Sequence, residues 1–81
     1  MVKVIFYNLL RSKYRVKEEW VDAGSIHSIL NQILSKYPNM SRSDFEHCVV
    51  FYQGRPIHPS GFQTDIADGT NIIITHFVGG G

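Results

Sequence analysis

An apolar stripe along one predicted helix constrains the fold more than any other feature of this sequence. Six residues fall at i, i+3, i+4, i+7, i+8 and i+11, the spacing of one α-helical face: Ile26, Ile29, Leu30, Ile33, Leu34 and Tyr37. Ser25 precedes the stripe as a predicted N-cap, and Pro38 follows it and disfavours helical backbone at Tyr37. A helix that is apolar on one face needs a second layer to cover that face.

The remaining segments have the composition of β-strands. Val2 to Leu10 is rich in Val, Ile, Phe, Tyr and Leu, and it predicts a strand that is apolar on both faces. The next segment alternates, with Tyr14, Val16 and Trp20 on one side, and predicts a half-buried strand that ends at Val21 and forms a hairpin with the first. Further strands are predicted at His47–Tyr52, briefly at residues 55–57, and from Thr70 to about Val78 after an Asp68-Gly69 turn.

The predicted order is strand, strand, helix, strand, short strand, strand. This order indicates an α+β fold, with a mixed sheet of four to five strands and one main helix packed on one face. We expect the helical stripe to pack on Val4, Ile72 and Ile74, with the first strand beside the last. Because 81 residues make one domain, we expect a single domain over residues 1–78 and a flexible glycine tail at residues 79–81.

The charge is nearly balanced but unevenly distributed. Eight basic and seven acidic residues give a net charge of +1, which argues against a nucleic-acid partner. The first 17 residues nevertheless contain five bases and no acid: Lys3, Arg11, Lys13, Arg15 and Lys17. A solvated edge is the simplest interpretation, and docking of a nucleotide or an acidic partner stays open.

Nothing in the composition indicates export or a membrane. Cys48 is the only cysteine, which excludes an internal disulfide and a cysteine-based metal site. The sequence shows no secretory signal, and no apolar run approaches the roughly 20 residues that span a bilayer. We therefore expect a soluble cytoplasmic protein with no membrane partner.

The sequence passes from its most strand-like segment directly into glycine. An extended glycine segment can enter a narrow channel and lets another protein approach its backbone closely, because glycine has no Cβ. Three extended residues, Gly79 to Gly81, reach about 10 Å. A terminal carboxyl has a pKa of about 3.3–3.7, so it is ionised at neutral pH and is an unhindered nucleophile toward an activated phosphate. The hypothesis is that the carboxylate of Gly81 is the functional group, as opposed to an ordinary loose end.

Together these features resemble one family over essentially the whole chain. They are the order of elements, the helix at residues 25–37, the turn at residues 66–70, and the terminal Gly80-Gly81. The opening residues 2–6 and the closing Ile72-Ile73-Ile74 also fit. The chain is similar to the β-grasp, ubiquitin-like sulfur carriers of the MoaD/ThiS family, the molybdopterin-synthase small subunit and the thiamine-biosynthesis carrier. It departs from many molybdopterin subunits, because residues 75–78 lack their paired prolines and are more like the thiamine carrier.

The resemblance implies both a chemistry and its partners. An adenylating enzyme related to ubiquitin-activating enzymes would adenylate Gly81 with ATP and magnesium, and sulfur would then give a thiocarboxylate. Gly80 would supply steric freedom next to the reactive group. A sulfur donor and an acceptor, such as a synthase large subunit, would be the other partners. This chain would bind no cofactor and would itself be a carrier and not an enzyme, although it could serve as the small subunit of a synthase.

A partner-binding surface is predicted on the sheet face away from the helix. If Ile72 and Ile74 point into the core, then Ile73, Thr75 and Phe77 point outward, and Phe51 or Tyr52 joins them. Val78 and Gly79 would extend this surface toward the reactive end.

Other chemistries are poorly supported by the spacing of candidate residues. Cys48 and His47 are neighbours in a predicted strand and point to opposite faces, so Cys48 is expected to be a buried apolar residue. Glu18 and Glu19 diverge for the same reason, and the four histidines lack metal-ligand spacing. Two alternatives to the carrier stay open: a ubiquitin-like modifier that uses the same glycine, and a β-grasp domain that only mediates interactions.

Overall fold

The computed structural model describes residues 1–76, and the side chains of all of these except residues 8–10. In chain order the elements are β1 (Val2–Phe6), α1 (Asn8–Tyr14), β2 (Glu18–Val21), β3 (Gly24–Ser25), α2 (Ile26–Lys36), η1 (Arg42–Phe45), β4 (Cys48–Tyr52), β5 (Arg55–Ile57), η2 (Pro59–Gly61), β6 (Asp65–Ile66) and β7 (Asn71–His76). No helix of this part of the chain is long and apolar enough to cross a membrane.

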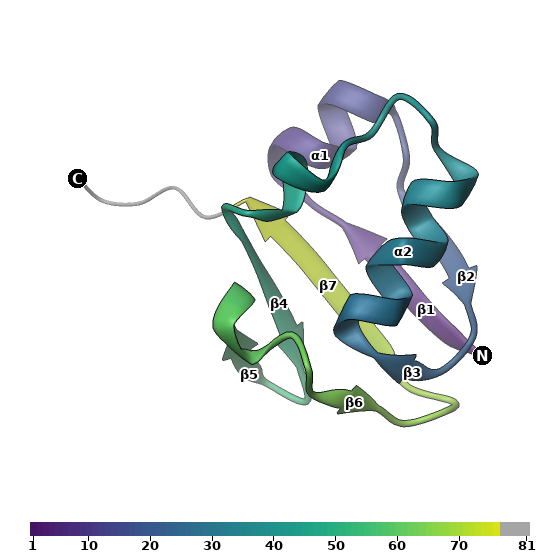
Figure 1. The fold of residues 1–81 in the computed structure, drawn as a ribbon, viewed down its shortest axis with the longest axis vertical. Helices are drawn as coiled ribbons and strands as arrows, with labels where there is room; N and C mark the ends of the chain where they lie inside the picture. Colours follow the sequence, from purple (N-terminus) through teal and green to yellow (C-terminus); the bar gives the residue numbers. More distant parts are fainter. Residues whose placement is uncertain (77–81) are drawn as a thin grey trace.

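The main sheet is mixed and has β7 at its centre. Its five strands lie in the order β2-β1-β7-β4-β5, and β1 runs parallel to β7 while all other neighbours are antiparallel (Figure 1). The prediction that the first strand lies beside the last is therefore confirmed. β5 is an edge strand, as the proline at position 56 requires. The α+β class and the mixed sheet with one main helix are also confirmed.

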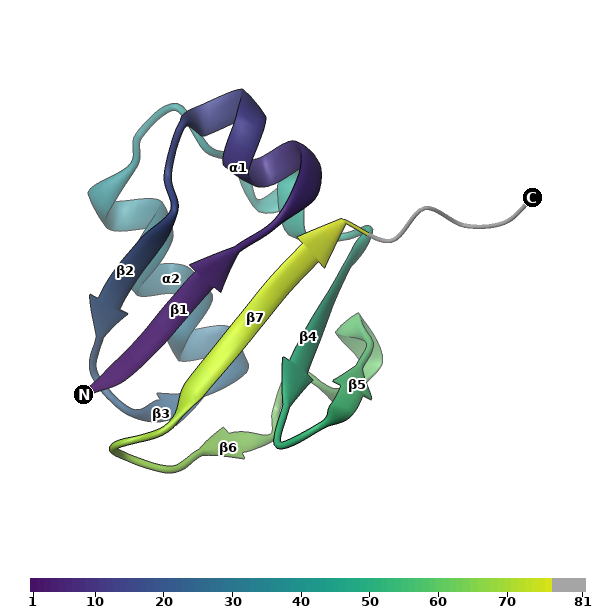
Figure 2. The same ribbon diagram turned by 180° about the vertical axis from the view of Figure 1, so that it is seen from behind.

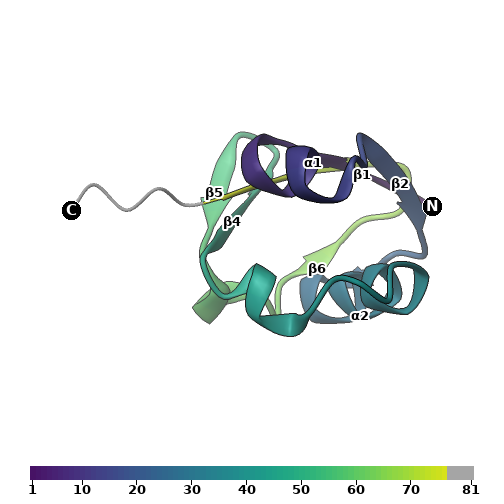
Figure 3. The same cartoon turned by 90° about the horizontal axis from the view of Figure 1, so that it is seen from above.

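The helix α2 packs its predicted stripe against one face of this sheet. Ile26, Ile29 and Ile33 are fully buried in one cluster with Val4, Ile72 and Ile74 of β1 and β7, and Leu34 packs at its edge. The hydroxyl oxygen of Ser25 accepts a hydrogen bond from the amide of Ser28 at 3.1 Å, so the predicted N-cap is confirmed. Figure 3 shows α2 in a layer separate from β1 and β2.

The first predicted strand is too long, because it ends at Phe6 and a helix follows. Residues 7–15 contain no β-branched residue, which was the signal in the sequence that β-structure stops there. Arg15 ends α1 in the left-handed conformation, with φ at 57°. A residue other than glycine in that region costs roughly 1–3 kcal/mol. The predicted hairpin of β1 and β2 is present, but α1 forms its connection.

The second predicted strand starts too early, and one of its side chains faces the wrong way. Val16 is buried and Tyr14 packs against the core, but Trp20 is 49% exposed. The strand begins only at Glu18, and its inward positions are Glu19 and Val21. The Glu19 carboxylate accepts hydrogen bonds from the side chains of Lys36 and Tyr37 on the helix side, at 3.1 and 2.7 Å.

A second sheet, of two strands, lies at the end of the molecule where α2 begins. β3 and β6 pair beneath the start of α2, where the carbonyl oxygens of Thr64 and Phe62 accept hydrogen bonds from the amides of Ile26 and His27 at 3.0 and 2.9 Å. The elements η2 and β6 contain too few residues to show a periodicity in the sequence. The predicted Asp68-Gly69 turn is present, and Gly69 has φ at 82°, a value that favours glycine.

We expect the substitution Ile33→Ala to lower the free energy of unfolding by roughly 2–5 kcal/mol, because it leaves a cavity under the helix. Ser35→Ala is the matched control, since Ser35 lies on the exposed face of α2. Its effect should stay within about 0.5 kcal/mol. Urea unfolding measures both, and a loss below about 1 kcal/mol for Ile33→Ala would contradict the packing described here.

Candidate functional site

The sheet face opposite α2 carries a row of apolar side chains. In Figure 2 this face is turned toward the viewer, and α1 lies beyond the end of β1. Strand pairing sets Ile5 beside Ile73, and Ile73 beside Phe51, so one row crosses β1, β7 and β4. Directly paired residues share a face, and the alternate positions fill the core. Phe51 is 39% exposed, and both isoleucines are half-buried.

The row continues in two directions. Pro56 of β5 lies opposite Phe51 and extends the row to the edge of the sheet. Two residues further along β7, Thr75 lies opposite Val49, which is only 5% exposed although it is not part of the main core cluster. The row of outward positions therefore extends toward the end of β7, but its exposed apolar part ends at Ile73 and Phe51, because Val49 is buried.

The structure brings three of the predicted partner-binding residues together: Ile73, Thr75 and Phe51. Tyr52, the alternative to Phe51, packs against the core instead. The remaining predicted residues lie outside the described part of the chain: Phe77, Val78, Gly79, Gly80 and Gly81. The expected flexibility of the tail therefore stays a prediction, as does the binding of a partner to this face.

Two exposed aromatic residues were not predicted as part of this surface. Tyr7 is 48% exposed and continues the outward positions of β1, and its amide donates to the carbonyl oxygen of Ile74 at 2.9 Å. The alternation of Ile5 and Tyr7 is the signal in the sequence for the outward position of Tyr7. The apolar composition of residues 2–10 instead predicts a strand that is buried on both faces. Trp20 lies opposite Lys3, whose ammonium is 5.9 Å from the centre of the indole ring. Aromatic side chains of this kind are enriched at protein interfaces.

One carboxylate links α1 to the segment that precedes β4. Asp44 of η1 accepts hydrogen bonds from the phenol of Tyr14 and, at 2.8 Å, from the amide of Ser41. The ammonium of Lys13 lies 3.3 Å from its other oxygen. Because Asp44 belongs to η1, which leads into β4, its carboxylate connects α1 to the other half of the chain.

These contacts shift the acid–base equilibria of the residues involved. Partial burial raises the pKa of Asp44, but the hydrogen bonds from Ser41, Tyr14 and Lys13 outweigh it and hold this pKa below its usual value. The hydrogen bond to Asp44 raises the pKa of Tyr14, because the phenol must keep its proton to donate. The contact is therefore strongest when Asp44 is ionised.

Cys48 is a structural residue, as predicted. Its side chain is 1% exposed, and its sulfur donates a hydrogen bond to the carbonyl oxygen of Asp44 at 3.0 Å. Burial raises the pKa of the thiol to about 12, so the reactive thiolate is scarce at neutral pH. His47 is exposed.

The acidic, histidine and cysteine side chains of the described residues are dispersed. Within residues 1–76, no three His, Cys, Asp or Glu side chains lie close enough together to hold a metal ion. Glu18 forms an ion pair with Lys3 at 3.2 Å, whereas Glu19 contacts α2, so the two carboxylates diverge as predicted. The Nδ1 atom of His76 is buried and has no hydrogen-bond partner among the described residues.

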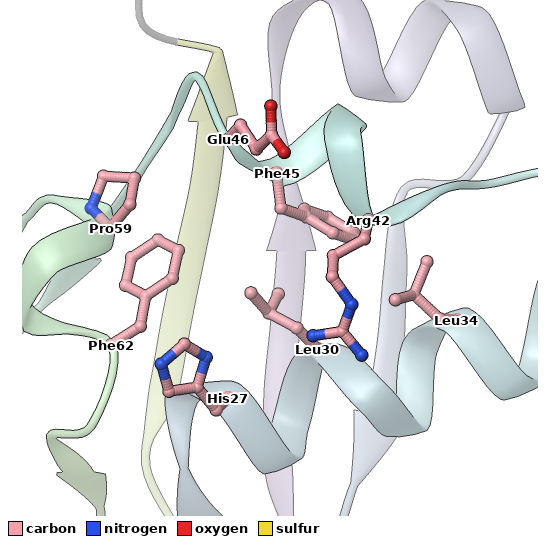
Figure 4. Close-up of a pocket in the computed structure, with 8 residues that line it drawn as sticks. All are labelled: His27, Leu30, Leu34, Arg42, Phe45, Glu46, Pro59 and Phe62. Carbon is pink, nitrogen blue, oxygen red and sulfur yellow. The ribbon is translucent and has the colours of Figure 1, made fainter.

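A small hollow lies on the other side of the molecule, between α2, η1 and η2 (Figure 4). Its volume is about 200 Å³, and its walls include Leu30, Phe45 and Phe62. The guanidinium of Arg42 lies at its rim and donates a hydrogen bond to the side-chain oxygen of Asn31 at 3.0 Å. This hollow lies on the helix side of the main sheet, whereas the apolar row lies on the opposite face.

Comparison of the sequence with models of known protein families and with curated proteins finds no match.

We expect Asp44→Asn to lower the free energy of unfolding at pH 7 by about 1–3 kcal/mol, since it removes charge-assisted hydrogen bonds. The folded-state pKa of Asp44 is lowered, so this stabilisation is present above the unfolded pKa of about 3.9 and is lost as the pH falls through the folded value.

Urea unfolding at pH 7 and at about pH 2.5 tests this expectation, because the difference from wild type should shrink at the lower pH. Asp65→Asn is the control, since that carboxylate is exposed. An equal loss for Asp44→Asn at both pH values would show that shape, and not charge, is responsible.

Proposed function

We propose that this chain is a β-grasp, ubiquitin-like sulfur carrier of the MoaD/ThiS kind. Its Gly81 carboxylate would be adenylated and converted to a thiocarboxylate. The sulfur would serve the synthesis of molybdopterin or tungstopterin, thiamine or a related compound. The arrangement in which a hairpin, a helix and two further strands surround a central last strand is compatible with the β-grasp fold.

One observation carries this proposal: the apolar row lies on the strand that leads into the glycines. Ile73 and Thr75 are outward residues of β7, and the sequence reaches Gly79 three residues after the last described residue, His76. A partner that binds the row therefore holds the chain within a few residues of Gly81. Fixing a reactive group in this way converts a chance encounter into an oriented reaction.

The chemistry requires only the terminal carboxylate from this chain. One carboxylate oxygen would attack the α-phosphate of ATP on the partner enzyme, and pyrophosphate would leave. A sulfur nucleophile from the donor would then attack the carbonyl carbon of Gly81, and AMP would leave with the former carboxylate oxygen. The side chain of Cys48 is an unsuitable sulfur acceptor, because it is buried and its pKa is raised to about 12.

Mass spectrometry of the protein from its native host separates the carrier from its alternatives. Sulfur in place of one terminal oxygen supports the carrier, and attachment to lysines of other proteins supports a modifier. A plain carboxylate in all conditions supports a domain that only mediates interactions. The same spectrum identifies the residue that carries the terminal carboxylate.

We expect that removing Gly81, or adding one bulky residue after it, abolishes ATP–pyrophosphate exchange by the host's adenylating enzyme. Either change moves the carboxylate by about 3.5 Å along the chain. A displacement of 1 Å from reacting geometry can already cost about a hundredfold in rate. Binding to the enzyme, measured by calorimetry, should persist with weaker affinity.

The matched control is Ile73→Ser with an intact tail. It should weaken binding and leave the exchange rate at saturation within about threefold of wild type, because the distance from the sheet to Gly81 is unchanged. A trimmed chain that is still adenylated at the original rate would show that Gly81 is not the reactive residue.

A further inference from the structure

Three exposed cations gather where α1 joins the sheet. Arg11 lies in the last turn of α1, and Arg15 is the C-cap residue that ends this helix. Lys17 lies beside the start of α1, because its carbonyl oxygen accepts a hydrogen bond from the amide of Phe6 at 2.9 Å. None of the three forms an ion pair within the described part of the chain. We call these residues the basic end: Arg11, Arg15 and Lys17.

Three nearby carboxylates are already engaged by other cations. Asp44 is bound by Lys13, Glu18 by Lys3, and Glu19 by Lys36. A fourth, Glu46, is exposed two residues before β4 and forms no ion pair among the described residues, so it offsets one of the three positive charges. The exposed Asp22 and Asp65 lie at the far end of the strands, beside β3 and β6 (Figure 1). Positive charge therefore predominates at the end of the sheet where β7 finishes.

The position of one of these cations is locally unfavourable. Arg15 occupies the left-handed position that ends α1, with φ at 57°, where glycine or asparagine is the usual residue. A glycine would suit the backbone at this position better, so the arginine side chain needs a reason outside the folding of the domain.

The basic end lies next to the apolar face and next to the end of β7. Tyr7, 48% exposed, directly precedes α1, and its amide is bound to the carbonyl of Ile74. A partner that covers the row of Ile5, Ile73 and Phe51 and reaches the glycines would therefore pass close to these cations.

We propose that the basic end docks against an acidic surface of the enzyme that adenylates the chain, and that it steers the glycine tail toward that enzyme's active site. This inference rests on the proposed function. Complementary charges accelerate encounter and fix orientation, and salt weakens them because the Debye length is about 10 Å at 0.1 M ionic strength. A net charge of +1 disfavours nucleic acid as the partner of this surface.

The test measures ATP–pyrophosphate exchange by the adenylating enzyme encoded in the same genome, with this protein as the varied substrate. Arg15→Gly should raise KM about threefold, and Arg11→Gln, Arg15→Gly and Lys17→Gln together about tenfold, with kcat changed less than twofold. Raising NaCl from about 50 to 300 mM should raise the KM of the wild type strongly and that of the triple variant only slightly.

Arg55→Gln is the matched control, because it removes one exposed positive charge at the opposite end of the strands and should leave KM unchanged. Arg15→Gly should be as stable as wild type in urea, so a loss of binding is not a loss of folding. A triple variant with wild-type KM and salt dependence would overturn the inference and leave the proposed function standing.

Two further outcomes would also overturn it. If the wild type supports no exchange at all, the proposed function fails, and this inference fails with it. The second outcome concerns a 20-nucleotide single strand, whose binding to this protein is measured by fluorescence anisotropy. If the wild type binds this strand with a lower Kd than it binds the adenylating enzyme, and the triple variant does not bind the strand, then the basic end binds nucleic acid.

Discussion

The pairing of β7 on both of its edges is the constraint on which the rest of the structure depends. β7 forms parallel hydrogen bonds with β1 and antiparallel ones with β4, so it joins the two halves of the chain. Ile72 and Ile74 are fully buried under α2, and each such side chain contributes about 1.5–3 kcal/mol by leaving water. Without this strand, the hairpin of β1 and β2 and the hairpin of β4 and β5 would share no sheet.

The same register that fills the core also defines the outer face. Side chains alternate along β7, so burial of Ile72 and Ile74 places Ile73 and Thr75 on the opposite side. A shift of pairing by one residue would exchange the two sets and bury the outward ones. The apolar row is therefore maintained by the energy of the core, and no separate interaction is needed to keep Phe51 and Ile73 adjacent.

The sequence predicted what depends on long, regular patterns. The stripe from Ile26 to Tyr37 and the alternation around Ile73 located the main helix and both faces of the central strand. It failed at α1, where seven residues are too few to show a helical period and where Asp44, 30 residues after Tyr14, fixes the helix. Such a contact between distant residues leaves no local pattern. The prediction for Trp20 was wrong because the alternation does not continue unbroken from the buried Val16 into β2, whose inward residues are Glu19 and Val21.

The unfavourable local features of the domain lie mainly where β1 and β7 end. Arg15 has a backbone conformation that suits glycine, and Nδ1 of His76 is buried without a partner among residues 1–76. Gln53 also has a positive φ, but it belongs to the tight turn between β4 and β5, which requires one. Stable domains break local rules chiefly at functional sites, and the core beneath α2 breaks none. The requirements of folding therefore do not explain the residues at the end of the sheet where β1 and β7 finish. In the sequence, the glycines follow β7 from this same end.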